Sequence, residues 1–335
     1  MIMEDYQLPW TQPGWDDEAS AWIHAQLEAQ GIQVTGEIEI LHRRAWSAFA
    51  RVPTSRGTIY YKAPAPALKF EAALTQALAH WRPDCMLPLL AANFEQGWML
   101  TPDSGVALVN LIQSPADISH WLKVIPLFAG VQIELAAHLA EILATGAPDR
   151  RLACLPDQYA QLLEDTGNLR VGLPQGLSPE EHRRLLDLRP CVAELCEQLA
   201  GYGLPETIVH EEIHRSNVIF GPAGYIFTDW SDCSVGHPFI TLLVTLRSVA
   251  HWQELDEDGP ELTHLRDIYL QAWTAFAPRQ DLLAAFQIAY RLGMIVRALA
   301  YHQVLGPLPE QYKVENDAIP GWLQDFLEAE TKAGV

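Results

Sequence analysis

The hydrophobic pattern of this 335-residue chain changes near residue 106, and that change restricts the folds open to it. Residues 36–63 alternate apolar with polar side chains and are rich in β-branched and aromatic types, which predicts three antiparallel strands. A helical pattern follows at about 66–81, and apolar runs at 86–93 and 97–102 suit two more strands. The first part of the chain is therefore predicted to be a small five-stranded antiparallel sheet with one main helix.

Helical periodicity dominates the rest of the chain, with one interruption. The predicted helices cover residues 115–146, 155–165, 178–201, 238–252, 260–277, 280–304 and 318–331. Between the third and the fourth, "ETIVH" and "NVIFGPAGYIFTDW" are β-branched runs around a Gly-Pro-Ala-Gly turn, which predicts a hairpin among helices. The chain should thus be an α+β protein with two domains, residues 1–106 and residues 107–335.

Composition excludes several classes of partner. The net charge of -20 makes nucleic acid an unsuitable ligand, because a phosphate backbone would be repelled. No apolar run approaches the length of a membrane span, and the start "MIMEDYQL" lacks the features of a signal peptide, so a cytoplasmic protein without membrane contact is expected. The acidic charge could attract a cationic small molecule, although a solvated acidic surface needs no function.

The stretch from His210 to His214, "HEEIH", matches the signature of zinc-dependent hydrolases. In those enzymes the motif lies on a helix, where residues i and i+4 face the same way and both imidazoles reach one ion. Here "TIV" precedes the motif and "NVIF" follows it soon after, so its flanks are typical of strands. The zinc hydrolase is therefore the least favoured function.

Residues 210–217 and the hairpin after them resemble another family, the aminoglycoside phosphotransferase-like branch of the protein-kinase-like fold. That family's signature is His-Gly-Asp-Leu-His-x-x-Asn, a hairpin, and then Asp-Trp or Asp-Phe. This chain has "HEEIHRSN", a hairpin, and Asp229-Trp230, so Glu212 precedes Asn217 by five residues and Asn217 precedes Asp229 by twelve. The resemblance covers most of the chain and implies a bilobal fold, with a nucleotide-binding N-lobe and a helical C-lobe carrying the catalytic loop and hairpin.

The resemblance also implies roles for individual residues. Asn217 and Asp229 would hold Mg²⁺, for which both offer hard oxygen ligands. Lys62, on the third predicted strand, would bind nucleotide phosphates while Glu71 on the next helix orients its ammonium group. Glu212 stands where an aspartate orients and deprotonates the acceptor hydroxyl.

Further positions are weaker candidates or depart from the family pattern. Ser47 could contribute to phosphate binding, although its loop, residues 42–47, lacks the usual glycines. His210 and His214 are expected to orient the loop, and Asp232 lies near the expected acceptor site. The segment Gly236-His237-Pro238 replaces a Gly-Asp-Pro of the family, so His237 is expected to support the loop.

The predicted function is transfer of the γ-phosphoryl group of ATP or GTP to a hydroxyl of a small molecule. The resemblance implies an antibiotic such as an aminoglycoside, or a metabolite such as an amino alcohol, as acceptor. A pseudokinase that binds nucleotide or ligand without transfer is the alternative, supported by Glu212 and the glycine-free loop. The protein is expected to be a monomer or a homodimer.

Overall fold

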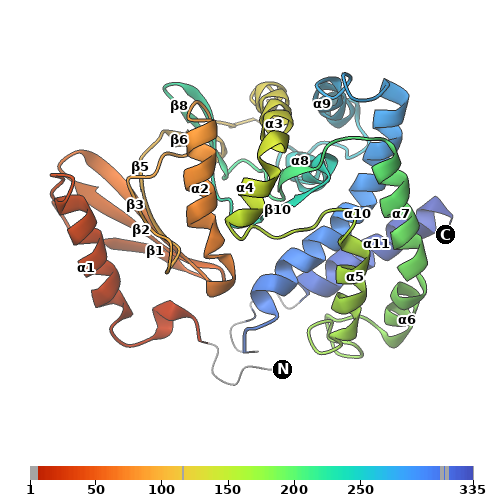
Figure 1. Ribbon diagram of the computed structural model, residues 1–335, viewed down its shortest axis with the longest axis horizontal. Helices are drawn as coiled ribbons and strands as arrows, with labels where there is room; N and C mark the ends of the chain where they lie inside the picture. Colours follow the sequence, from red (N-terminus) through yellow and green to blue (C-terminus); the bar gives the residue numbers. More distant parts are fainter. Residues whose placement is uncertain (1–6, 115–116, 310–312, 314–316, 335) are drawn as a thin grey trace. The chain divides into compact units, whose positions relative to one another are not determined.

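The computed structural model describes residues 7–114, 117–309, 313 and 317–334 (Figure 1). The chain divides into two compact units. Unit 1 takes in the chain up to Val106, together with Ile219–Ser231 and a segment that begins at Gln303. Unit 2 contains Ala107–Val218, Asp232–His302 and the C-terminal segment. Two pieces from the second half of the sequence therefore belong to the same unit as the N-terminal sheet.

Unit 1 is built on a five-stranded antiparallel sheet, as the alternating pattern predicted. The strands are β1 (Glu39–Arg43), β2 (Ser47–Thr54), β3 (Gly57–Pro64), β4 (Ala91–Asn93) and β5 (Trp98–Pro102), in the order β1-β2-β3-β5-β4. β3 is central, and its neighbouring residues Tyr61 and Lys62 point to opposite faces. The central position of β3 fixes Lys62 between two hydrogen-bonded strands.

Each face of this sheet carries one helix (Figure 1). On one face the Tyr61 ring packs against Trp15 and Trp22 of α1 (Trp15–Glu28), with ring centroids 6.4 and 6.0 Å apart. On the other, Lys62 contacts Glu71 of α2 (Phe70–Trp81). The aromatic core and the charged cluster therefore lie on opposite faces of the sheet, because the side chains of a strand alternate between its faces.

Unit 2 is mostly helical. Its α-helices are α3 (Trp121–Leu135), α4 (Leu139–Ala144), α5 (Leu155–Glu164), α6 (Pro179–Asp187), α7 (Arg189–Gly201), α8 (Leu242–Trp252), α9 (Pro260–Gln271), α10 (Arg279–Leu305) and α11 (Ala318–Ala333). A capping box begins α6, because Ser178 Oγ accepts from Glu181 N at 3.1 Å and Ser178 N donates to Glu181 Oε2 at 2.7 Å.

Two predicted helices are each divided in the structure. The helix expected over 115–146 begins at Trp121 and is interrupted by a 3₁₀ turn at Ala136–His138, while residues 115 and 116 lie outside the described part of the chain. The helix expected over 178–201 breaks at Leu188, between α6 and α7. Pro190 explains the second break, because it has no backbone N–H to donate to the carbonyl four residues earlier and its ring crowds that carbonyl.

The predicted hairpin is present, with additional strands that the sequence pattern did not predict. β7 (Thr207–His210) precedes the loop, and β8 (Val218–Gly221) and β9 (Gly224–Phe227) form the hairpin. The additional strands are β10 (Cys233–Gly236), which pairs antiparallel with β7, and the two-residue β6 (Val106–Ala107). All four residues of β10 are buried, so it lacks the alternation that marks a half-buried strand.

Two helical stretches, Trp121–Ala144 and Arg279–Leu305, are long and apolar enough to cross a membrane by length and composition alone. This corrects the expectation that no apolar run approaches that length. Buried core helices share these properties, and 67% of the second apolar window lies inside the protein, against 33% of the first. The two stretches are therefore weak evidence for a membrane span.

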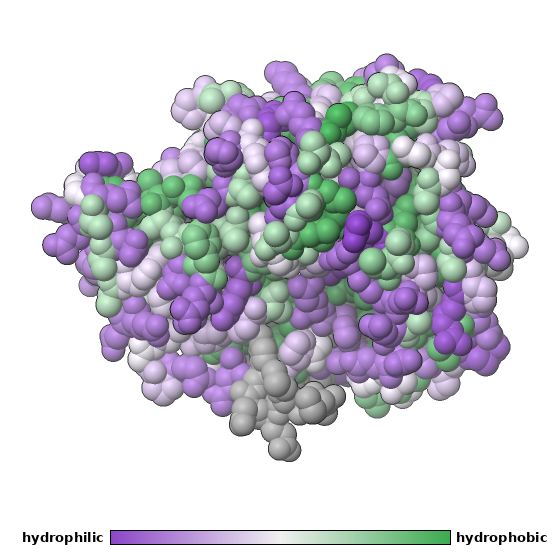
Figure 2. Space-filling model, viewed as in Figure 1, coloured by the Kyte–Doolittle hydropathy of each residue, from purple (hydrophilic) through white to green (hydrophobic). Residues whose placement is uncertain are grey.

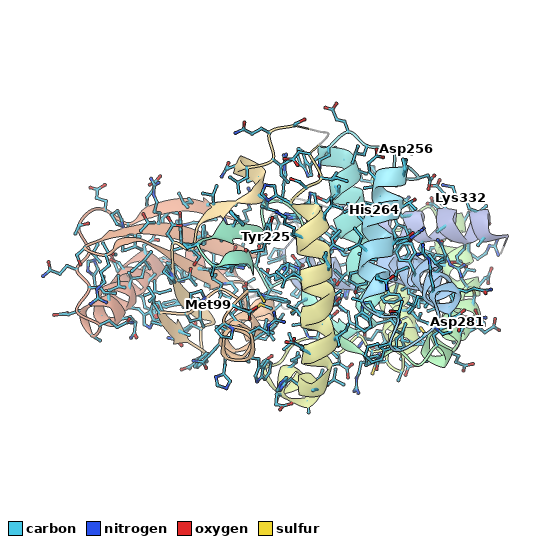
Figure 3. All side chains as sticks on the ribbon, turned by 90° about the horizontal axis from the view of Figure 1, so that it is seen from above. Met99, Tyr225, Asp256, His264, Asp281 and Lys332 are labelled. Carbon is cyan, nitrogen blue, oxygen red and sulfur yellow. The ribbon has the colours of Figure 1, made fainter. Side chains whose placement is uncertain are left out.

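The surface carries many polar and charged side chains. Figure 2 shows hydrophilic and hydrophobic residues interspersed over the face that it draws. Exposed charged residues such as Asp256 and Lys332 project from unit 2, whereas Met99 on β5 is only 4% exposed (Figure 3).

Candidate active site

Lys62 is the centre of a charged cluster inside unit 1. Its Nζ lies 2.6 Å from Glu71 Oε1 and 2.6 Å from Asp229 Oδ1. The Glu71 side chain is 2% exposed and that of Lys62 is 15% exposed. Burial alone would lower the pKa of Lys62, but the carboxylates of Asp229 and Glu71 outweigh it and raise the pKa above its ordinary value. The lysine is therefore held as an ammonium group between two acids that are far apart in the sequence.

Asp229 has a backbone conformation that suits a functional position. Its φ is 62°, in the left-handed region that non-glycine residues seldom occupy. Its Oδ1 accepts hydrogen bonds from Lys62 Nζ at 2.6 Å and Ser231 Oγ at 2.7 Å, yet its side chain remains 41% exposed. Such a conformation costs about 1–3 kcal/mol and persists where neighbouring contacts enforce it. The turn thus presents a carboxylate, fixed by two donors, to solvent.

The loop between β7 and β8 is a turn tied together by its own side chains. Asn217 Nδ2 donates to the Glu212 carbonyl at 3.0 Å, which directs the amide nitrogen into the loop. His210 Nδ1 accepts from Glu212 N, and His214 Nδ1 accepts from Ser216 N, both at 3.2 Å. The Nδ1 atom of each histidine therefore accepts a hydrogen bond from the loop backbone, as an orienting group would.

The zinc interpretation of "HEEIH" fails on backbone geometry. His210 ends strand β7, and the residues after it form a turn rather than a helix. The i, i+4 geometry that brings two imidazoles to one ion is therefore missing. His210 is also 0% exposed, with its ring edge-on to Phe128, so it belongs to the packed interior of unit 2.

Arg297 of α10 contacts the loop carboxylate and was not identified from the sequence. Its Nη2 donates to Glu212 Oε1 at 2.5 Å, and its Nη1 lies 3.7 Å from both Glu211 Oε2 and Asp232 Oδ1. Burial alone would lower the pKa of Arg297, but the carboxylates of Glu212 and Asp232 raise it above its ordinary value. The sequence feature that could have identified Arg297 is its position as the single charged residue in the apolar run "LGMIVRALA".

A second missed contact explains how the loop accommodates Glu211, where the related signature has glycine. Glu211 is 1% exposed, and its Oε1 accepts from Arg150 Nη1 at 2.6 Å and from Ser234 Oγ at 2.7 Å. Arg150 is itself 4% exposed. Arg150 and Glu211 therefore form a buried ion pair at the start of the loop, although they are 61 residues apart in the chain.

The remaining predicted residues differ in how they are placed. Ser47 begins β2 in unit 1 and is only 3% exposed, and its carbonyl accepts from Arg44 N at 2.9 Å. Asp232 joins Glu212 around Arg297 in unit 2. Thus Lys62, Glu71 and Asp229 form one cluster in unit 1, and Glu212, His214, Asn217 and Asp232 lie in or beside the loop of unit 2. The catalytic, cofactor-binding and metal-binding roles remain predictions.

The chemistry of the donor atoms fits a magnesium ion. Asp229 offers a partly exposed carboxylate, and Asn217 offers an amide whose nitrogen is turned toward the loop. Mg²⁺ prefers such oxygen ligands and keeps several waters or phosphate oxygens as further ligands. Each of the two residues therefore carries, within its own unit, an oxygen atom of the kind that binds magnesium.

His237 supports the segment after β10 as a neutral imidazole. It is 1% exposed, its Nδ1 accepts from Phe239 N at 3.3 Å, and burial lowers its pKa to about 3. Since an unfolded histidine titrates near 6.5, the unfolded chain takes up a proton below that pH which the folded protein does not. Stability attributable to His237 is therefore lost as the pH falls from about 6.5 toward 3.

We expect the free energy of unfolding to fall by about 2 kcal/mol between pH 7 and pH 5 because of His237. His237→Asn keeps an acceptor for Phe239 N but does not titrate, so its pH dependence should be flatter by that amount. Urea unfolding of both proteins at the two pH values measures the difference. Parallel pH profiles would contradict the prediction.

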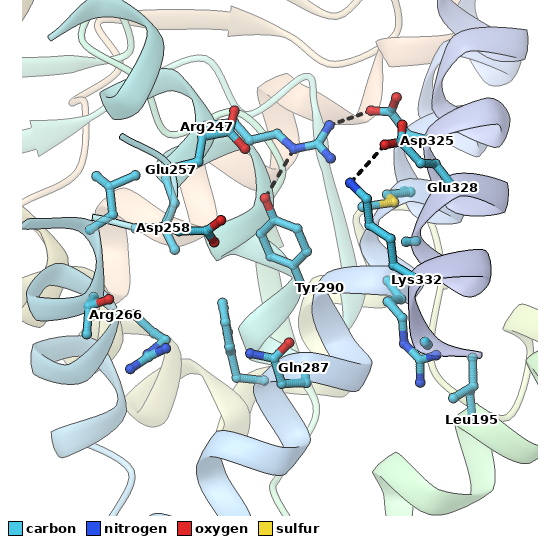
Figure 4. A pocket seen from close by; sticks show the side chains of 18 of the residues that line it. Leu195, Arg247, Glu257, Asp258, Arg266, Gln287, Tyr290, Asp325, Glu328 and Lys332 are labelled. Carbon is cyan, nitrogen blue, oxygen red and sulfur yellow. Dashed lines mark hydrogen bonds and ion pairs between the residues drawn. The ribbon is translucent and has the colours of Figure 1, made fainter. Parts of the chain in front are cut away.

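A cavity of about 1070 Å³ lies in unit 2, lined by residues of α7, α8, α9, α10 and α11 (Figure 4). Arg247 donates to Tyr290 Oη at 3.1 Å and to Asp325 Oδ2 at 2.5 Å, and Lys332 lies 2.8 Å from Glu328. No residue assigned from the sequence lines it. The cavity is therefore distinct from the clusters around Lys62 and Glu212.

Solved structures of several kinases and phosphotransferases share the fold of this chain. The chain resembles an ethanolamine kinase of Plasmodium vivax (TM-score 0.62, 13% identity, covering 100% of this chain and 99% of that one). It also resembles a choline/ethanolamine kinase family protein of Mesorhizobium loti, with a TM-score of 0.59 and 14% identity over 93% of this chain and 94% of that one. A type I macrolide 2'-phosphotransferase matches with a TM-score of 0.57 and 15% identity over 90% of this chain and 96% of that one. At these identities the likeness establishes the kinase-like fold.

Sequence comparison supplies the family. No curated protein matches the chain. A family model described as the phosphotransferase enzyme family matches residues 58–283, which begin at β3 and include the loop, the hairpin and Asp229. Because this match spans more than half of the 335 residues, the chain belongs to the phosphotransferase enzyme family.

Proposed function

We propose that the protein transfers the γ-phosphoryl group of ATP or GTP to a hydroxyl group of a small molecule. The observation that carries this proposal is the position of Lys62, 2.6 Å from both Glu71 and Asp229. Phosphoryl transfer depends on positioning and on neutralising phosphate charge, and a buried ammonium beside a carboxylate suited to magnesium serves both needs. A surface lysine would have no reason to be fixed in this way.

Each part of the chain has a role in the proposed reaction. Residues 1–106 bind the nucleotide: Lys62 binds its phosphates, Glu71 holds the Lys62 ammonium group in place, and Ser47 contributes to phosphate binding. Asn217 and Asp229 hold Mg²⁺, and residues 107–335 carry the loop and the acceptor site. Glu212 accepts the proton of the acceptor hydroxyl, whose oxygen attacks the γ-phosphorus as the bond to the nucleoside diphosphate breaks.

The acceptor is proposed to be a small hydroxyl compound, and a cationic one is favoured by the net charge of -20. The structural neighbours include kinases named for ethanolamine and choline and a phosphotransferase named for macrolides. The Glu212 carboxylate, however, is already paired with the positive charge of Arg297, so it does not by itself favour a cationic acceptor. We propose that the protein acts in the cytoplasm, as a monomer or homodimer, without nucleic acid or membrane.

The proposal is tested by a panel of acceptors with ATP or GTP and Mg²⁺. The panel contains amino alcohols, aminoglycosides, macrolides and neutral polyols, and phosphorylated product is detected by mass spectrometry. We expect one class to be phosphorylated, and Glu212→Gln to lower kcat by about 10²-fold or more with nucleotide affinity unchanged. Nucleotide binding without product from any acceptor would favour the pseudokinase instead.

A further inference from the structure

Arg297 occupies a position where a charge is costly. It lies on α10 between Val296 and Ala298, both 0% exposed, and is itself 2% exposed. An arginine in such surroundings is retained only when its charge is compensated. Three carboxylates surround it, yet only that of Glu212 is within hydrogen-bond distance. The guanidinium is therefore directed at the loop carboxylate.

The guanidinium is also fixed in place by aromatic rings. Its Cζ lies 5.0 Å from the centroid of the Tyr301 ring and 5.9 Å from that of Trp322 on α11. Rings at this distance attract a cation and limit its motion. Within the described part of the chain, Nε and Nη1 of Arg297 make no hydrogen bond. Among the described residues, the carboxylate of Glu212 is thus the acceptor to which the Arg297 side chain donates a hydrogen bond.

Exposure separates this contact from the structural ion pairs nearby. In the Arg150–Glu211 pair the side chains are 5% and 0% exposed, and in the Arg291–Glu330 pair on the same helix the acid is 1% exposed. In the Arg297–Glu212 pair the arginine is 3% exposed but the acid is 23% exposed. Glu212 can therefore meet an acceptor that Arg297 itself cannot reach.

We propose that Arg297 is a positioning residue that holds the Glu212 side chain in the conformation that receives the acceptor hydroxyl. This inference rests on the proposed function. Arg297 binds Oε1, which places Oε2 on the side of His214, 3.9 Å from its Nε2. Glutamate has one more rotatable bond than the aspartate of the related signature. Without an anchor, its carboxylate would therefore occupy several conformations, of which only some would face the acceptor hydroxyl. A displacement of about 1 Å costs on the order of 10²-fold in rate.

The test uses Arg297→Met and Arg297→Lys, with Arg291→Met and Arg291→Lys as matched controls on the same helix. Arg297→Met should lower kcat by about 10²-fold, while the KM for the acceptor changes by less than about 3-fold and nucleotide affinity stays constant. Arg297→Lys should restore part of the rate, because an ammonium group can bind one carboxylate oxygen. The Arg291 variants should lose thermal stability with little change in kcat.

A double-mutant cycle distinguishes positioning from a separate effect. If Arg297 acts through Glu212, the protein with both Arg297→Met and Glu212→Gln should be no slower than Glu212→Gln alone. Multiplying losses, or a kcat for Arg297→Met within about 3-fold of the unmodified protein, would overturn the proposal. If Arg297→Met does not fold, a kcat for Arg297→Gln within about 3-fold of that of the unmodified protein has the same meaning, because a neutral amide carries no charge to hold the Glu212 carboxylate.

The unmodified protein separates this inference from the function on which it rests. If it phosphorylates no acceptor and does not hydrolyse the nucleotide, the proposed function fails and the role of Arg297 fails with it. If it is active and Arg297→Met is equally active, only the inference about Arg297 fails.

Discussion

Asp229→Asn is expected to fold and to bind nucleotide, yet to transfer phosphate about 10²–10³-fold more slowly than the unmodified protein. Asparagine has the same shape and tolerates the left-handed φ of 62°, so the turn should persist. It lacks the negative charge that would hold Mg²⁺ and that lies 2.6 Å from Lys62 Nζ. Steady-state kinetics with the acceptor found by screening, together with a thermal unfolding curve, measure the two effects.

The control for this prediction is Ser231→Ala, which removes one donor to Asp229 Oδ1 but keeps the carboxylate. It should lose much less activity. A kcat for Asp229→Asn near that of the unmodified protein would refute the proposed role of Asp229. A collapse of the thermal transition would instead show that the charge is needed for folding.

Substitution of Lys62 alone would change stability as well as activity. Lys62→Ala would remove the proposed phosphate contact, but the structure places the lysine against Glu71, which is 2% exposed. Removing the Lys62 ammonium group would leave the buried Glu71 carboxylate without this cation, which lowers the free energy of unfolding. The informative variant therefore combines Lys62→Met with Glu71→Gln.

Arg150→Met is expected to lower the free energy of unfolding of unit 2 by about 3–5 kcal/mol, because it leaves the Glu211 carboxylate buried without its main cation. The two side chains are 5% and 0% exposed and lie 2.6 Å apart, so solvent cannot replace the lost charge. Urea unfolding, followed by fluorescence and by circular dichroism to resolve the two units, measures the loss.

The matched control replaces both members of the pair, Arg150→Met with Glu211→Gln. Because no buried charge is then left alone, this protein should be more stable than Arg150→Met. If the double variant is less stable than the single one, the pair contributes net stability of its own and the interpretation as compensation is wrong.

Much of the fold could be predicted from the sequence because the signals are local. Strand alternation over 36–63 and the capping box at Ser178 depend on residues a few positions apart, and both appear in the structure. β10 was missed because it has only four residues, of which Val235 alone is of a type enriched in strands. The break at Leu188 was missed because the apolar pattern continues through Pro190, although proline cannot donate the hydrogen bond to the preceding turn.

The ordered motif from Glu212 to Asp229, together with Lys62 and Glu71, determined the family and the expected chemistry, because residue types and spacings along one chain suffice to express them. The partners of these residues were decided only by tertiary structure. Arg297 reaches Glu212 across 85 positions, and Arg150 reaches Glu211 across 61. A charge in an apolar helix is visible in the sequence, but the carboxylate that compensates it depends on which helix packs behind the loop, and no local pattern encodes that packing.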